Sequence, residues 1–101
     1  MMTKKKIQAL IDDLMEDQNF YRKQINSTAE SAKKFGYIVN KYDDFVFLYR
    51  PGYEPVGGSL QMSLDSCRGR IEGLQHAINE LKKEPLLELL LLYSLKKQSL
   101  L

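Results

Sequence analysis

The chain has 101 residues, of which 44% are hydrophobic and 28% are charged, so we expect one folded domain over residues 1–101. A formal charge of +2, from 15 basic and 13 acidic residues, does not by itself predict a polyanionic partner. The single cysteine, Cys67, excludes an internal disulfide and favours the cytoplasm, that of a host cell if the protein is viral.

The first predicted element is a long helix over residues 3–35. Apolar or small residues recur along it at steps of four and three, and only Gln18 interrupts the series. The series is Ile7, Ile11, Leu14, Tyr21, Ile25, Thr28, Ala32 and Phe35. This heptad spacing is typical of a helix that packs along another helix. We expect Thr3 to cap its start and Gly36 to end it.

Charged residues on this helix indicate a solvated outer face. Lys4, Lys5 and Lys6 begin it, and the acidic residues that follow exclude the apolar core of a signal peptide. These acidic residues are Asp12, Asp13, Glu16 and Asp17. We interpret them as the polar side of an amphipathic helix, although they could meet a basic partner.

A β-hairpin is predicted over residues 37–50, because "YIVNKYDDFVFLYR" is rich in β-branched and aromatic residues. Its strands should cover 37–42 and 45–50, with Asp43 and Asp44 in the turn. Residues 51–59 are predicted to be a loop, because "RPGYEPVGGS", residues 50–59, has two prolines and three glycines.

A second heptad-patterned helix is predicted over residues 60–84. Its apolar positions again step by four and three without a gap: Leu60, Leu64, Cys67, Ile71, Leu74, Ile78 and Leu81. Ser59 is the expected cap, and Pro85 is expected to end or kink the helix near Glu84. A separate leucine-rich helix over 86–98 should follow.

Seven of the leucines after Pro85 predict self-association. They are Leu86, Leu87, Leu89, Leu90, Leu91, Leu92 and Leu95. A chain of this size cannot readily cover a helix that is apolar around most of its circumference. We expect a homo-oligomer, and its contact residues are predicted to be Leu87, Leu90, Leu91 and Leu95. Contact with a different protein and internal packing are the alternatives. About ten apolar residues are too few to span a membrane, which takes about 20.

No residue pattern indicates catalysis or a bound cofactor. Cys67 and His76 are the obvious nucleophile and base, but their spacing puts them on opposite faces of one helix. His76 shares a face with Glu72 and Glu80, which is at most a weak cation site, because zinc takes three or four protein ligands. The "GGSL" before the second helix lacks the spacing of a phosphate-binding loop. We therefore predict a protein that is not an enzyme and has no cofactor or metal.

The hairpin carries the residues best suited to binding a partner. Phe45, Phe47 and Tyr49 alternate onto one face and Val46 and Leu48 onto the other, so both faces are apolar. One face can pack on the helices, while the other is available to a partner or is covered by the C-terminal helix. Because aromatic residues and arginine dominate interface hot spots, the predicted partner-binding residues are Phe45, Phe47, Tyr49, Arg50 and Tyr53.

The expected architecture is α+β and mainly α. Two long helices form an antiparallel helical hairpin, a β-hairpin lies between them, and a leucine-rich helix follows Pro85. Pairing of the helices between two chains is the alternative.

Two functional hypotheses follow. The first is a non-enzymatic interaction protein, an adaptor or inhibitor that occupies the surface of another protein. The second is a nucleic-acid-binding module, because aromatic rings beside positive charge can stack bases. Its contact residues would be Lys4, Lys5, Lys6, Lys41 and Arg50.

Overall fold

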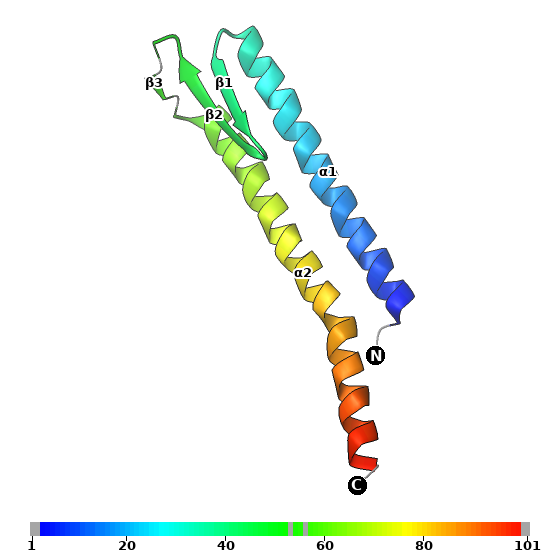
Figure 1. Cartoon of the computed structure of the whole chain (residues 1–101). Coiled ribbons are helices and arrows are strands. Elements are labelled where there is room, and N and C mark those ends of the chain that lie inside the picture. Colours follow the sequence, from blue (N-terminus) through cyan, green and yellow to red (C-terminus); the bar gives the residue numbers. More distant parts are fainter. Residues whose placement is uncertain (1–2, 53, 56, 100–101) are drawn as a thin grey trace.

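The computed structural model describes residues 3–52, 54–55 and 57–99, with the backbone alone for residues 54 and 84–99. Two long helices lie side by side and antiparallel, and a small sheet lies against one end of the pair (Figure 1). The elements in chain order are α1 (Lys4–Lys34), β1 (Ile38–Tyr42), β2 (Phe45–Arg50), β3 (Glu54–Pro55) and α2 (Ser59–Ser99). The molecule measures 72 × 22 × 17 Å. The expected helical hairpin with a β-hairpin between its helices is confirmed.

Local signals set both ends of α1. The Thr3 hydroxyl accepts a hydrogen bond from the Lys6 amide at 3.2 Å, as expected of the cap. At the other end, Gly36 has φ +89 and its amide donates to the Lys33 carbonyl. The Tyr37 amide reaches back to the Ala32 carbonyl, which completes a Schellman motif. This motif turns the chain directly from α1 into β1.

The sheet is antiparallel in the order β1-β2-β3. Tyr42 pairs with Phe45, so Asp43 and Asp44 form a two-residue turn, and Asp43 takes a positive φ of 51, which aspartate tolerates. β3 lies in the segment that the sequence predicts to be a loop, and it pairs only with the end of β2. Its Pro55 is acceptable because β3 is an edge strand.

The side chain of Gln61 on α2 takes the place of a longer third strand. Its Oε1 accepts from the Leu48 amide at 3.0 Å and its Nε2 donates to the Val46 carbonyl at 2.8 Å. These backbone groups lie on the β3 side of β2, beyond the two residues that β3 reaches. Gln61 therefore fixes β2 to α2 by hydrogen bonds as well as by apolar contact.

α2 runs from Ser59 to Ser99 as one helix, so the prediction of a separate helix over 86–98 is wrong. Proline removes one amide donor and crowds the preceding turn, at a cost of about 3 kcal/mol. No glycine follows Pro85, and leucine and glutamate are strong helix formers, so the helix continues. At its start the Gly58 carbonyl accepts the first helical hydrogen bond, from the Met62 amide at 3.0 Å. The cap is therefore Gly58, and the prediction of Ser59 as the cap is wrong.

Among the side chains that the structure describes, the apolar core forms two clusters. The larger one lies between the helices and the sheet and contains Ile25, Ala29, Ala32, Val46, Leu48, Leu64 and Ile71. The smaller one lies between the helices alone and contains Ile7, Ile11 and Ile78, with Leu14 and Leu81 packed against it. The sheet thus covers only one half of the helical hairpin (Figure 1).

Gln18, which breaks the heptad series, is 3% exposed and lies between the two clusters. Its Nε2 donates to the Ile71 carbonyl at 3.2 Å and to Gln75 Oε1 at 3.1 Å. Phe35, the last residue of the predicted series, is 79% exposed, because α1 ends there and the chain turns away. Its expected place in the core is therefore wrong.

Along the part of the chain that the structure describes, no helix is long and apolar enough to cross a membrane.

Candidate functional site

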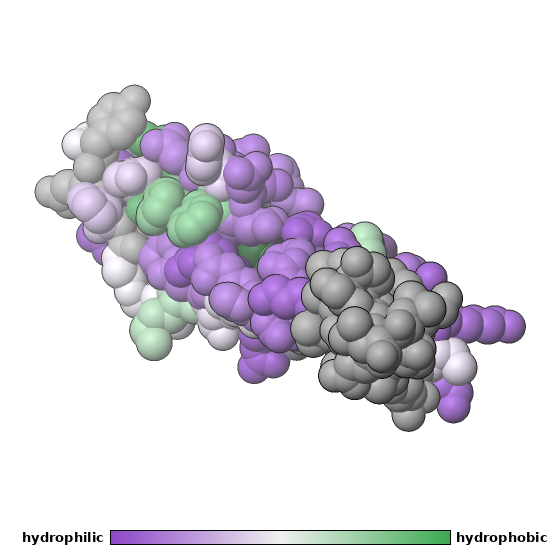
Figure 2. Space-filling view, turned by 60° about the horizontal axis from the view of Figure 1, so that its bottom comes forward, coloured by the Kyte–Doolittle hydropathy of each residue, from purple (hydrophilic) through white to green (hydrophobic). Residues whose placement is uncertain are grey.

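The two faces of β2 meet different surroundings. Val46 and Leu48 are 3% and 1% exposed and belong to the larger cluster. Phe45 and Phe47 point the other way and are 38% and 45% exposed. α2 leads away from the sheet toward its C-terminal end, so that segment does not cover these rings (Figure 1). In Figure 2 a group of hydrophobic side chains lies toward the sheet end of an otherwise mainly hydrophilic face.

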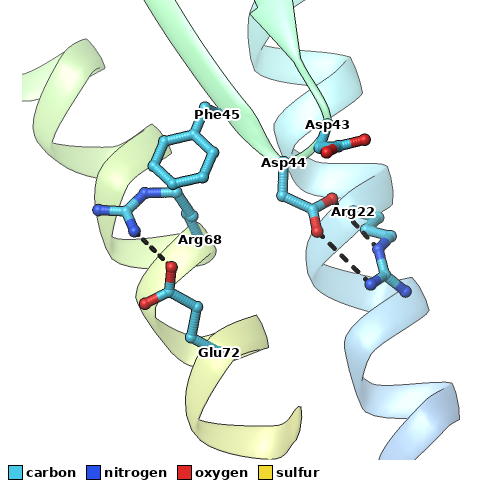
Figure 3. A pocket seen from close by; sticks show the side chains of 6 residues that line it. All are labelled: Arg22, Asp43, Asp44, Phe45, Arg68 and Glu72. Atoms are coloured by element: carbon cyan, nitrogen blue, oxygen red, sulfur yellow. Dashed lines mark hydrogen bonds and ion pairs between the residues drawn. The ribbon is translucent and has the colours of Figure 1, made fainter.

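Phe45 and Phe47 form a stacked pair held from the side by α2. Their ring centroids are 6.3 Å apart with an interplanar angle of 21°. The Arg68 guanidinium lies 4.5 Å from the Phe45 ring centroid, and its Nη1 donates to Glu72 Oε1 at 2.7 Å (Figure 3). Arg68 and Glu72 are one helical turn apart, so the ion pair holds the guanidinium against the ring.

A hollow of about 540 Å³ opens where the sheet ends, beneath the hairpin turn. Its lining comes from both helices and the turn: Arg22, Asp43, Asp44, Phe45, Arg68 and Glu72. Arg22 Nε donates to Asp44 Oδ1 at 3.2 Å and fixes the turn to α1. Each arginine of the hollow is thus matched by a carboxylate, so the hollow carries no excess of positive charge.

The residues that the sequence selects for partner binding are partly brought together. Phe45 and Phe47 form the exposed pair, and Tyr49 lies half-buried on the same face of β2. Arg50 is exposed, but alternation along the strand puts it on the side of Val46 and Leu48. Tyr53 lies outside the described residues.

Arg68 is not among the residues predicted to bind a partner. Its pairing with Glu72 could be expected from their four-residue spacing on a helix. Its place over Phe45 could not, because it depends on how the hairpin lies against α2. Tyr42, which pairs with Phe45 and is 75% exposed, was likewise absent from the predicted partner-binding residues.

The cations proposed for nucleic-acid binding are not gathered on one surface. Lys4, Lys5 and Lys6 begin α1, at the opposite end of the helical hairpin from the sheet (Figure 1). Lys41 Nζ donates to Asn26 Oδ1 on α1. Asp43, Asp44 and Glu72 lie beside Phe45 in the hollow.

A second hollow, of about 380 Å³, lies between the helices and contains Cys67. The Cys67 thiol is half-buried and donates to Gln24 Oε1 at 3.7 Å. The Arg70 guanidinium lies over the Tyr21 ring and donates to the Tyr21 hydroxyl at 3.0 Å.

His76 is exposed on α2. Over residues 3–83, apart from 53, 54 and 56, no three His, Cys, Asp or Glu side chains are placed to share a metal ion.

The leucines predicted to mediate self-association, Leu87, Leu90, Leu91 and Leu95, lie on α2 in the segment for which only the backbone is described. They belong to the part of α2 that extends past the start of α1 (Figure 1).

Comparison of the chain with protein families, with curated proteins and with solved structures finds no match.

Proposed function

We propose that the protein is a non-enzymatic interaction protein that occupies the surface of another protein with the outer face of its sheet. We call this surface the aromatic face and define it by Tyr42, Phe45, Phe47 and Tyr49 on the sheet and Arg68 on α2. The observation that carries the proposal is the stacked and exposed pair of Phe45 and Phe47, held in place by Arg68.

The aromatic face is ordered before any partner arrives. The rings stack on each other, Arg68 is fixed by Glu72, and β2 is fixed to α2 by Gln61. Side chains that are already ordered lose little conformational entropy on binding, which otherwise costs about 0.5–1.5 kcal/mol each. Burial of exposed aromatic area then contributes to affinity directly.

The charges beside the rings favour a partner with an apolar contact surface. Arg22 and Arg68 are each paired with a carboxylate, and Asp43 adds a negative charge at the turn. A nucleic acid would meet three carboxylates beside Phe45. Binding through the aromatic face should therefore depend weakly on salt, whereas binding to phosphates weakens steeply as salt rises.

The test compares two phenylalanines of similar exposure on different surfaces. Phe47 is 45% exposed on the aromatic face, and Phe20 is 55% exposed on α1. Tagged wild-type protein and the variants Phe47→Ala and Phe20→Ala are used to capture proteins from cytoplasmic extract of the native host, with quantification by mass spectrometry. We expect a partner that Phe20→Ala retains and Phe47→Ala loses by at least about tenfold, as for an interface hot spot. If Phe47→Ala and Phe20→Ala capture every partner protein to the same extent, the proposal is contradicted.

Nucleic-acid binding is the alternative function, and it would use the aromatic rings of the hairpin together with Lys4, Lys5, Lys6, Lys41 and Arg50. The purified protein is titrated with single- and double-stranded nucleic acid at low and high salt. If it binds tightly at low salt and Phe47→Ala abolishes binding, the alternative replaces the first proposal.

A further inference from the structure

α2 extends beyond the helix with which it is paired. Gln18 bonds to Ile71 and Gln75, and Ile7 and Ile11 pack with Ile78, so the start of α1 is level with about residue 84 of α2. From there α2 continues to Ser99 with no other element of the described chain beside it (Figure 1). We call residues 84–99 the overhang; at about 1.5 Å per residue it is about 23 Å long.

The half of the helical hairpin next to the overhang is incompletely covered. We call it the bare half and define it as residues 4–18 of α1 with residues 72–83 of α2. Among the described side chains, three apolar residues of its cluster are buried, and Leu14 and Leu81 remain half-buried. Leu10 and Met15 are 41% and 49% exposed. Two helices alone leave these side chains open to water, whereas Val46 and Leu48 of the sheet complete the core in the other half.

The lengths of the two segments match. Residues 4–18 of α1 span about 21 Å as a helix, close to the length of the overhang. A helix as long as the overhang and rich in leucine could therefore cover the bare half along its whole length.

Charges along the two segments are arranged in opposite order. From its N-terminal end the α1 part of the bare half is first basic and then acidic: Lys4, Lys5 and Lys6, then Asp12, Asp13, Glu16 and Asp17. The overhang is first acidic and then basic: Glu84 and Glu88, then Lys96 and Lys97. The spacing from Glu84 to Lys96 equals that from Lys5 to Asp17.

We propose that the overhang of each chain packs on the bare half of a second copy, parallel to that copy's α1. This direction sets Glu84 and Glu88 beside the basic start of α1, and it sets Lys96 and Lys97 beside Glu16 and Asp17. The opposite direction would set like charges side by side. The overhang of the same chain cannot fill this place, because it continues α2 away from the bare half.

The arrangement closes as a symmetric dimer. Within the second copy α1 and α2 are antiparallel, so an overhang parallel to that α1 is antiparallel to that α2. The α2 helices of the two copies therefore run in opposite directions across a twofold axis near residue 84. Each half of the dimer is then a bundle of three helices. The aromatic face lies at the end of each copy that is away from the dimer contact. The proposed dimer and the proposed partner binding can therefore be tested independently.

Charge reversal tests the direction of packing. Sedimentation equilibrium should give a dimer for the wild type. Lys96→Glu with Lys97→Glu should weaken the dimer at least about tenfold, as should Glu16→Lys with Asp17→Lys, and the four changes together should restore it. Lys33→Glu with Lys34→Glu, at the other end of α1, is the matched control and should leave the dimer unchanged. A monomeric wild type would overturn the proposal. So would a fourfold variant whose dimer is no stronger than that of the two double variants.

Cysteine cross-linking tests the register. In a Cys67→Ser background, Glu84→Cys lies near the twofold axis and should form a disulfide-linked dimer on mild oxidation. Leu92→Cys should not, because its two copies lie about 24 Å apart along the axis. Cross-linking through residue 92 and not through residue 84 would mean that the overhangs pair only with each other, which overturns the proposal. Circular dichroism of each variant checks that the helices are retained.

Discussion

The two halves of the helical hairpin reach different degrees of burial. In the half beneath the sheet, which we call the covered half, Ile25, Ala29, Ala32, Leu64 and Ile71 are all buried with Val46 and Leu48 of β2. In the bare half, three isoleucines are buried and the leucines beside them are only partly so. A third layer therefore decides how completely the side chains between the helices leave water.

The covered half also carries the features that suit it to binding. The sheet that completes the core presents its other face, with Phe45 and Phe47, to solvent. The bare half has no such rigid platform, and what it offers a partner is uncovered apolar area on its helices. A complete core supports a preformed recognition surface, whereas an incomplete core favours association with another chain.

The largest expected difference between the halves comes from removing a buried aliphatic side chain from each. Leu48→Ala should lower the free energy of unfolding by about 3 kcal/mol, because the side chain is enclosed on all sides. Ile11→Ala should cost about 2 kcal/mol, because its surroundings are open to water and can relax. Urea unfolding of dilute, monomeric protein measures both. An equal or larger loss for Ile11→Ala would remove the distinction between the halves.

Gln18 marks the boundary between the halves, and replacing it should reduce their difference. Gln18→Leu joins the two clusters and should raise the free energy of unfolding by about 1 kcal/mol, since a buried polar group is replaced by an apolar one. Gln75 is exposed and can return its amide oxygen to water. Gln18→Ala removes both hydrogen bonds without filling the space and should cost about 1–2 kcal/mol. Destabilisation by both variants would show that the hydrogen bonds outweigh the apolar gain.

A smaller effect is expected from the ion pair that holds the hairpin turn on α1. Arg22 and Asp44 have side chains 41% and 30% exposed, so water and salt screen their interaction. Arg22→Ala should lower the free energy of unfolding by about 0.5 kcal/mol at low salt and by less at high salt. Unfolding curves at two salt concentrations check this. A loss that does not change with salt would indicate that the packing of the Arg22 stem matters more than its charge.

The sequence predicts the elements where their signals are local. Thr3 and Gly36 bound α1, and the two aspartates at 43 and 44 set the hairpin turn, because capping and turn formation depend on neighbouring residues. The helix end predicted at Pro85 is wrong, because the effect of a proline is not decided by that residue alone. Its effect depends on whether the following residues favour another structure, and the residues after it favour a helix.

Contacts between distant elements could not be predicted in the same way. The position of Arg68 over Phe45 depends on the packing of β2 against α2, in which Gln61 takes part. The bonding of Gln18 to Ile71 and Gln75 depends on the register of the two helices. The alternating pattern of β2 did predict two apolar faces, but only the placement of the sheet shows that Phe45 and Phe47 point outward.

Hydrogen exchange at several protein concentrations tests most directly whether the covered half is complete in one chain and the bare half is completed by a second. We expect protection of the α1 amides in residues 21–34 to be independent of concentration. Protection of residues 7–18 should be lower in dilute protein and should rise toward that of 21–34 as the dimer forms. Equal protection of both segments at every concentration would contradict this account.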